Sequence, residues 1–215
     1  MKYYASGIVL LALFGILAAV VTYDRDQVTS WDYSAFTKIN NPQGKVLNQI
    51  MVDLTKYGRE AVWIATTAIV FVLGGSSGRR TAALLVISFI ILIPLGTVLK
   101  DEIDRPRPTP ALPSDLLTSS DRDSSFPSGH AVIVSAGAFV MLARFNQGRK
   151  MAWSVILAIE AALVIYSRVY VGNHYPLDVV AGTLLGTGVA SIVVAFSRHL
   201  NPLFLRLDLI GRKKS

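Results

Sequence analysis

The sequence contains no cysteine, which excludes disulfide bonds and every metal or redox site built on cysteine. It is also poor in charge, because charged residues make up 16% of the chain, against about 25% in typical soluble domains. Histidine is scarce as well, with three residues in 215. Hydrophobic residues instead make up 52% of the chain, and the mean hydropathy is +0.49. This composition indicates a protein embedded in a membrane.

The charges that are present give a formal net charge of +7. A basic balance can reflect nucleic acid, an anionic membrane surface or an anionic substrate. The basic residues lie at the ends of apolar runs, and the sequence has no basic stripe interleaved with aromatic residues. We therefore expect the bilayer and an anionic substrate as partners, and no nucleic acid.

Long apolar runs predict an all-α fold, a bundle of six transmembrane helices in a single domain over residues 1–215. A run of about 18–20 residues spans a bilayer core roughly 30 Å thick, and hydrocarbon leaves no alternative to a helix for unpaired backbone groups. The second and fourth runs are short, so we expect their helices to take in flanking polar residues. The first could instead be a cleavable signal peptide, but its flank, VVTYDRD, lacks a clear small-x-small cleavage site. The six predicted spans are Tyr3–Val21, Ala61–Gly74, Thr81–Leu99, Ala131–Ala143, Met151–Tyr166 and Val179–Phe196.

The connections predict the orientation of the bundle. Basic residues are almost equally numerous on the two sides, so their count does not decide it. Two connections, GGSSGRR and RFNQGRK, are very short and basic, and basic residues in short loops mark the cytoplasmic side. We therefore expect both termini in the cytoplasm of a plasma-membrane protein, with residues 24–60, 100–130 and 167–178 on the external side.

The first external stretch of interest is KDEIDRPRP, residues 100–108. Lys100 and Arg107 are two helical turns apart, so a helix would place both on one face before the prolines end it. On its own, the stretch could also be a charge cluster reaching the lipid headgroups. Asp101, Glu102 and Asp104 resemble a cation site, but their basic neighbours, Arg105 among them, favour a salt-bridged surface.

The second stretch, SSFPSGH, opens the fourth span at residues 124–130. Ser128 and Gly129 fall where a helix begins, and the free N–H groups of a helix start bind anions. Gly129 allows close approach of a ligand to the backbone, and His130 follows directly. A simple helix cap would give a similar pattern.

The third stretch, SRVYVGNHYPLD, joins the fifth and sixth spans at residues 167–178. Arg168 ends one span, and Pro176 suits the first turn of the next helix. Asp178 lies close enough to His174 to bind its ring and to leave the other ring nitrogen free as a base or nucleophile. His199 lies in the predicted cytoplasmic tail and has no expected role.

Together these side chains suit phosphoryl transfer, in which charge on three equatorial oxygens must be stabilised. The predicted external face gathers two histidines, a carboxylate, a helix start and the cations Lys100, Arg107 and Arg168. One histidine can attack phosphorus while the other protonates the leaving oxygen. No metal or other cofactor is needed for this chemistry.

The three stretches match K-x6-R-P, P-S-G-H and S-R-x5-H-x3-D in order, and the sequence therefore resembles the type 2 phosphatidic acid phosphatase (PAP2) superfamily. The resemblance implies that His174 is the nucleophile that forms a phosphohistidine, that Asp178 orients it, and that His130 is the general acid. It further implies a phosphate site made of Lys100, Arg107, Ser128, Gly129 and Arg168, with no metal. Candidate substrates are a polyprenyl diphosphate such as undecaprenyl diphosphate, slightly favoured, phosphatidylglycerophosphate and phosphatidic acid.

Several alternatives stay open at this point. Soluble vanadium haloperoxidases carry the same constellation, but six membrane spans fit them poorly. The chain could bind or transport lipids without hydrolysis, although anion binding alone does not need a histidine pair. It could also transfer the phosphoryl group to another lipid or glycan. The oligomeric state is not indicated.

Other residues carry weaker predictions. Trp31, Tyr33 and Phe36 are typical of anchors at the membrane interface. Glu160, inside the fifth span, either faces the bundle or lines a substrate path. Gly182 and Gly186 form a small-xxx-small pair, which we expect to pack the sixth helix within the chain rather than to form a dimer.

Overall fold

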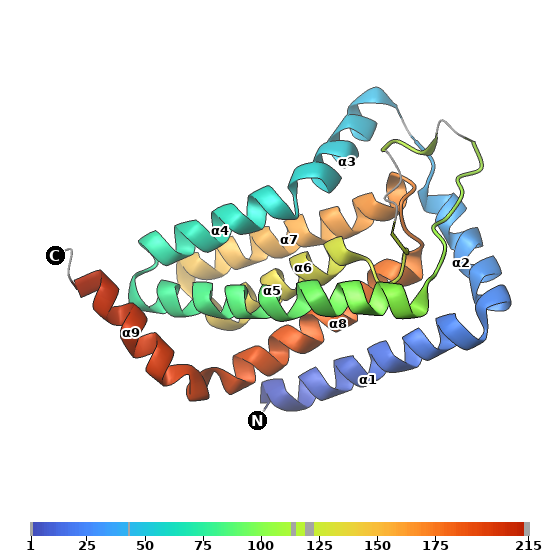
Figure 1. Cartoon of the computed structure of the whole chain (residues 1–215). Coiled ribbons are helices and arrows are strands. Elements are labelled where there is room, and N and C mark those ends of the chain that lie inside the picture. The colour runs from blue at the N-terminus through green and yellow to red at the C-terminus, as the bar shows by residue number, and fades with distance from the viewer. Residues whose placement is uncertain (1, 43, 113–114, 119–122, 213–215) are drawn as a thin grey trace.

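The computed structural model describes residues 2–42, 44–112, 115–118 and 123–212. Within these residues the chain is α-helical, apart from a short 3₁₀ helix at Phe196–Leu200 and the connecting segments (Figure 1). The helices are α1 (Lys2–Tyr23), α2 (Arg25–Ile39), α3 (Lys45–Tyr57), α4 (Glu60–Leu73), α5 (Gly75–Ile103), α6 (Gly129–Arg144), α7 (Gly148–Tyr170), α8 (Pro176–Ala195) and α9 (Asn201–Arg212).

Each of the six predicted apolar runs forms a helix. Four helical stretches are long and apolar enough to cross a membrane, namely α1, α5, α7 and the stretch from α8 to Leu207. The other two, α4 and α6, take in polar flanks such as Glu60 and His130, as expected, but remain 14 and 16 residues long.

Helix α6 forms the centre of the bundle, where it packs against α5, α7 and α8. The contact with α8 is close because α8 presents glycine to it: a Cβ atom on Gly186 would lie 2.1 Å from the carbonyl oxygen of Val132. The small residues of α8 therefore pack within the chain, as predicted. This contact also joins the two helix starts, because the Ser128 N–H donates to the Asp178 carbonyl at 3.0 Å.

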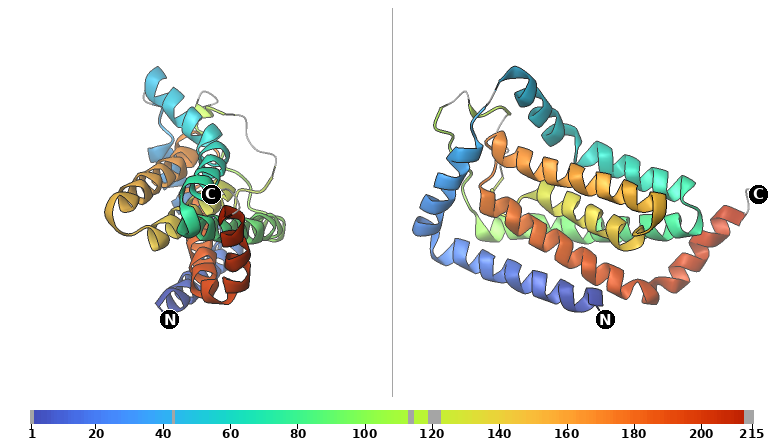
Figure 2. Two further views of the ribbon diagram at one scale, coloured as in Figure 1. Left: turned by 90° about the vertical axis from the view of Figure 1, so that its left-hand side faces the viewer. Right: turned by 180° about the vertical axis from the view of Figure 1, so that it is seen from behind.

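The two ends of the bundle differ in what they carry (Figures 1 and 2). The chain ends lie at the end that also holds the α4–α5 and α6–α7 turns. The opposite end carries α2, α3, the long connection from α5 to α6 and the turn from α7 to α8. The three connections predicted to share one side therefore do so.

Helix α2 crosses that end and is more than a surface anchor. Phe36 is fully buried, and its ring packs against that of Tyr175 at a centroid distance of 5.9 Å. The Tyr33 hydroxyl donates to the Thr109 carbonyl at 3.1 Å. The prediction of an interfacial anchor is wrong for Phe36, because α2 covers the start of α8 and buries its apolar face.

Helix α5 ends before Arg107, so the prediction that Lys100 and Arg107 share a helix face is wrong. The helix stops at Ile103, and Asp104 takes the left-handed conformation with φ 44°. Pro106 favours this end, because it pushes Arg105, the residue before it, out of the α conformation and has no N–H to continue the helix. Arg107 therefore reaches the site from an extended segment.

Candidate active site

The connections at one end of the bundle surround the polar end of a cavity of about 1330 Å³. Its lining there includes Lys100 at the end of α5, Gly129 and His130 at the start of α6, and His174 in the α7–α8 turn. Both candidate histidines thus face one cavity, although they lie far apart in the sequence. Arg59 and Asp123, which the sequence did not single out, also line it.

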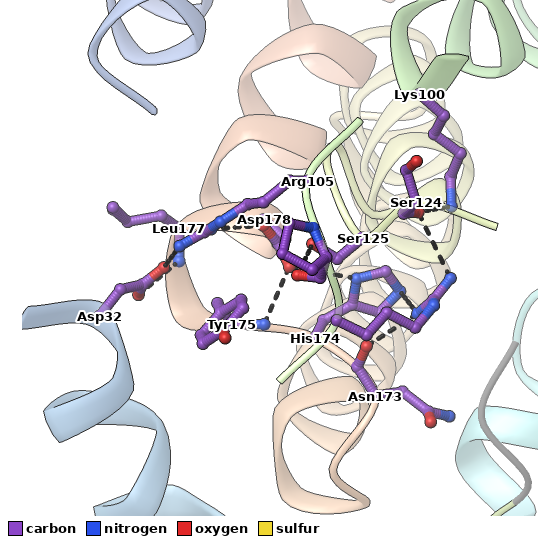
Figure 3. Close-up of polar contacts among 12 residues, drawn as sticks. Asp32, Lys100, Arg105, Ser124, Ser125, Asn173, His174, Tyr175, Leu177 and Asp178 are labelled. Carbon is purple, nitrogen blue, oxygen red and sulfur yellow. Dashed lines mark hydrogen bonds and ion pairs between the residues drawn. The ribbon is translucent and has the colours of Figure 1, made fainter. Parts of the chain in front are cut away.

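His174 is buried, and its two ring nitrogens have different surroundings (Figure 3). Nδ1 lies 3.5 Å from Oδ2 of Asp178, and Nε2 lies 3.2 Å from Nη1 of Arg107. A guanidinium only donates, so Nε2 is the acceptor and Nδ1 carries the proton toward the carboxylate. Burial and the charges of Arg168, Arg107 and Lys100 lower the pKa of His174 well below its usual value of 6.5. His174 is therefore neutral, and the lone pair on its Nε2 lies near the cationic side chains of Arg107, Arg168 and Lys100.

Asp178 is held in place by its own helix and by an arginine. Its Oδ2 accepts the Tyr175 N–H at 2.9 Å, the capping contact that starts α8. Its Oδ1 accepts Nη1 of Arg105 at 2.6 Å. The carboxylate thus faces His174 with both oxygens fixed, because it belongs to the first turn of α8.

Arg105 connects the site to α2 (Figure 3). Its second terminal nitrogen, Nη2, donates to Oδ2 of Asp32 at 2.8 Å, and Oδ1 of Asp32 accepts the Leu177 N–H at 3.1 Å. The guanidinium lies 4.2 Å from the ring centre of Tyr175. Arg105 is 1% exposed, so the prediction that it belongs to a salt-bridged surface is wrong.

The sequence held one signal for Asp32 and none for Arg105. Asp32 and Phe36 are four residues apart, and both are fully buried, so they share the face of α2 that turns inward. An acid on the apolar face of a helix could have been recognised from this spacing. Arg105 pairs with residues 73 positions away, and no local pattern reports such a contact.

Lys100 and Arg107 converge on one carboxylate, that of Asp123. Nζ of Lys100 donates to Oδ2 at 2.6 Å, and Nη2 of Arg107 donates to Oδ1 at 2.5 Å. Burial raises the pKa of the Asp123 carboxyl, but hydrogen bonds and charge from Lys100 and Arg107 outweigh it and bring that pKa to about 2. The two cations are therefore placed to hold two oxygens of a single oxyanion.

Arg168, at the end of α7, contributes from within the protein. It is 3% exposed, and its Nη1 donates to the Thr55 hydroxyl at 2.8 Å. Its backbone carbonyl accepts the His174 N–H at 3.2 Å. Arg168 thus fixes the turn that carries His174 and adds positive charge beside it.

The start of α6 has the form of an anion site. Ser128 is the N-cap of the helix, and its buried hydroxyl has no hydrogen-bond partner among the described residues. Apart from its chain neighbours and the nearby backbone of its own helix, the nearest described atom to a Cβ built on Gly129 is Nη1 of Arg59, at 3.7 Å. Open space over the free N–H groups of a helix start is where an oxyanion binds.

His130 is oriented by the corner between α3 and α4. Its Nε2 lies 3.0 Å from the Thr55 carbonyl, which can only accept, so Nε2 carries a proton. Nδ1 then has the free lone pair, and it lies 3.4 Å from Nη1 of Arg59. Nδ1 is therefore the nitrogen that His130 presents to Arg59.

The rest of the cavity is apolar and runs away from the histidines between α4 and α5. It is lined by residues such as Trp63 and Phe89, and by Leu203 and Leu207 of α9 at its far end. Arg79 and Lys100, both in the lining, are about 30 Å apart along α5 at 1.5 Å per residue. The cavity thus has the length of a bilayer core.

Comparison with known proteins points to one family. A sequence model described as "PAP2 superfamily" matches residues 80–202. The chain is 43% identical to "Undecaprenyl-diphosphatase" of Sulfolobus acidocaldarius over 90% of its length and 91% of that protein. It is 29% identical to "Undecaprenyl-diphosphatase BcrC" of Bacillus subtilis over 84% of its length and 90% of that protein.

A solved structure supports the same grouping. The fold is similar to the crystal structure of a transmembrane PAP2 type phosphatidylglycerolphosphate phosphatase from Bacillus subtilis. The TM-score is 0.71 at 26% sequence identity, and the match covers 91% of this chain and 97% of that one.

Proposed function

The chain belongs to the PAP2 superfamily, and on this premise we propose that it hydrolyses a polyprenyl diphosphate, such as undecaprenyl diphosphate, to the monophosphate and inorganic phosphate. The choice of substrate is supported by the names of the Sulfolobus and Bacillus relatives. The chemistry is supported by His130 and His174 facing one cavity with three motif cations around them. This convergence is the observation that carries the proposal.

In the first step, Nε2 of His174 attacks the terminal phosphorus. Lys100, Arg107 and Arg168 hold its oxygens, together with Ser128 and the N–H of Gly129. His130, protonated on both ring nitrogens in the substrate complex, gives the Nδ1 proton to the bridging oxygen as the bond to phosphorus breaks. Asp178 stabilises the charge that forms on the His174 ring, because its carboxylate lies on the Nδ1 side.

In the second step, water attacks the phosphohistidine. His130, which lost its proton in the first step, takes one from this water, and the bond from phosphorus to Nε2 breaks. Inorganic phosphate leaves, and both histidines return to their starting states. One pair of imidazoles thus carries out both half-reactions.

The proposal places the site at the outer face of a six-span protein with cytoplasmic termini. The six spans are the four helical stretches that are long enough to cross a membrane, together with α4 and α6, which are shorter but apolar and pack against them. The short basic turns then face the cytoplasm. The apolar cavity between α4 and α5 runs along the spanning helices, across the bilayer, and suits a polyprenyl tail.

Phosphate release from a panel of lipids tests the proposal. The purified protein, with EDTA present, is given polyprenyl diphosphate, phosphatidylglycerophosphate and phosphatidic acid, beside the His174→Ala variant. We expect the diphosphate to give the highest kcat/KM and the variant to release no phosphate above background. Binding without release would indicate a lipid-binding protein, and a phosphorylated lipid or glycan product would indicate a transferase.

A further inference from the structure

Arg59 lies outside the three sequence motifs, yet it reaches the centre of the site. Its Nη1 is 3.4 Å from Nδ1 of His130 and 3.7 Å from a Cβ position on Gly129. Its guanidinium therefore stands over the start of α6, on the side where His130 presents its free nitrogen. Arg59 lines the same cavity as Lys100 and His174.

The corner that carries Arg59 is fixed by close packing. A Cβ atom on the preceding residue, Gly58, would lie 2.3 Å from Cγ2 of Val164 and 2.9 Å from Oε1 of Glu160. Only glycine lets this corner approach α7 so closely. The same corner supplies the Thr55 carbonyl that binds His130, so the backbone of Arg59 keeps a fixed position relative to the His130 ring while its side chain can turn.

The present partners of Arg59 can be exchanged for a ligand. It donates to Glu60, its neighbour in sequence. The two side chains are 33% and 51% exposed, and exposed ion pairs contribute little to stability. Its contact with Nδ1 of His130 must end when that nitrogen is protonated, because an N–H cannot accept. A general acid at His130 therefore requires Arg59 to turn toward another acceptor.

We propose that this acceptor is the second phosphoryl group of a diphosphate substrate, the one that remains on the lipid. This inference rests on the proposed function and adds a residue that selects diphosphates over monophosphates. When His174 attacks the terminal phosphorus, the bond to the bridging oxygen breaks and His130 protonates that oxygen. The leaving phosphoryl group then lies beside His130, where Arg59 binds its oxygens in bidentate fashion. A lipid monophosphate has carbon at this place and gives Arg59 no acceptor.

The test uses two substrates with the same tail, farnesyl diphosphate and farnesyl monophosphate. Arg59→Gln should lower kcat/KM for the diphosphate about 10- to 100-fold, the effect of losing a charge-assisted hydrogen bond. For the monophosphate, kcat/KM, or its inhibition constant if it is not cleaved, should change less than about threefold. Arg59→Lys should recover part of the diphosphate activity, because it restores charge but not the fork geometry.

Lys56→Gln is the matched control, because Lys56 is an exposed cation on the preceding turn. It should leave both substrates near wild type. The inference would be overturned if Arg59→Gln lowered kcat/KM equally for both substrates, or for neither. If the glutamine variant is unfolded in detergent, the same comparison is made with Arg59→Lys. Failure of the proposed function is recognised separately, because wild type itself would then release no phosphate from any polyprenyl diphosphate.

Discussion

At the scale of single residues, the two histidines differ in which ring nitrogen the protein holds. His174 turns Nδ1 to Asp178 and leaves Nε2 among cations. His130 turns Nε2 to the Thr55 carbonyl and leaves Nδ1 beside Arg59. The motif spacing could pair His174 with Asp178, because they are four residues apart. It could not supply the partners of His130, since Thr55 and Arg59 lie in an unrelated part of the chain.

The lowered pKa of His174 predicts that its ring stays neutral in mildly acidic solution. Burial and three cationic side chains disfavour the charged form, so the ring should not charge as the pH falls through 6.5. Nitrogen NMR of the imidazole can show this in a His130→Gln, His199→Gln variant, which keeps His174 alone of the three histidines. A titration midpoint at or above 6.5 would contradict the burial and charge described here.

In the proposed site, Asp123 lies where we expect two oxygens of the substrate phosphate to bind, because Lys100 and Arg107 both bind its carboxylate. With a pKa of about 2, the Asp123 carboxyl is charged at neutral pH, and we expect it to compete with the substrate phosphate for Lys100 and Arg107. Asp123→Asn should therefore strengthen inhibition by inorganic phosphate about three- to tenfold. Asp101→Asn removes the same charge from an exposed position of α5 and should have little effect. Equal inhibition constants for wild type and Asp123→Asn would refute the competition.

At the scale of elements, α2 is part of the active-site framework. Asp32 binds Arg105, Arg105 binds Asp178, and Asp178 faces His174, so a helix outside all three motifs is connected to the proposed nucleophile through two ion pairs. The sequence predicted the apolar helices because long runs of one composition report them directly. It missed this chain of contacts because buried pairs between distant segments leave no periodic signal.

Replacing Arg105 tests the importance of this framework. Arg105→Met leaves two buried carboxylates without their partner, which should destabilise the protein by about 3–5 kcal/mol. Asp32→Asn should cost less, because the amide can still accept the Leu177 N–H and Arg105 keeps Asp178. Unfolding in detergent, followed by tryptophan fluorescence, measures both variants. If Arg105→Met were as stable as wild type, the ion pairs of Arg105 with Asp32 and Asp178 would not contribute to the stability of the protein.

The prolines after α5 show a second limit of local reasoning. A spacing of seven residues suggested one helix face for Lys100 and Arg107, and the two side chains do meet. They meet at the Asp123 carboxylate because Arg107 lies in the non-helical segment after Asp104, and not because a helix continues. The sequence thus predicted that Lys100 and Arg107 lie close together, but for the wrong physical reason. We expected the prolines to end the helix after Arg107, whereas it ends at Ile103.

At the scale of the whole molecule, the apolar cavity joins the site to the far end of the bundle. Gly96 lines this cavity, and, apart from its chain neighbours and the nearby backbone of its own helix, no described atom lies within 4 Å of a Cβ built on it. Gly96→Leu should therefore fill space that the proposed lipid tail would occupy, without a clash in the protein.

We expect Gly96→Leu to lower kcat/KM about tenfold for a long-chain polyprenyl diphosphate, the scale of a few buried methylene groups. A short soluble phosphate ester should be affected much less. Gly15→Leu is the matched control. A Cβ built on Gly15 of α1 likewise meets no described atom within 4 Å outside its own helix, and Gly15 is not part of the cavity lining. Equal effects of Gly96→Leu on long and short substrates would show that the cavity does not hold the tail.

The most direct test is to trap the phosphorylated enzyme with a β-³²P-labelled polyprenyl diphosphate and to locate the label by mass spectrometry. We predict an acid-labile, alkali-stable phosphate on His174, absent from His174→Ala. Substrate turnover without any label, or a label on another residue, would contradict attack by His174 on a phosphoryl group that it shares with His130.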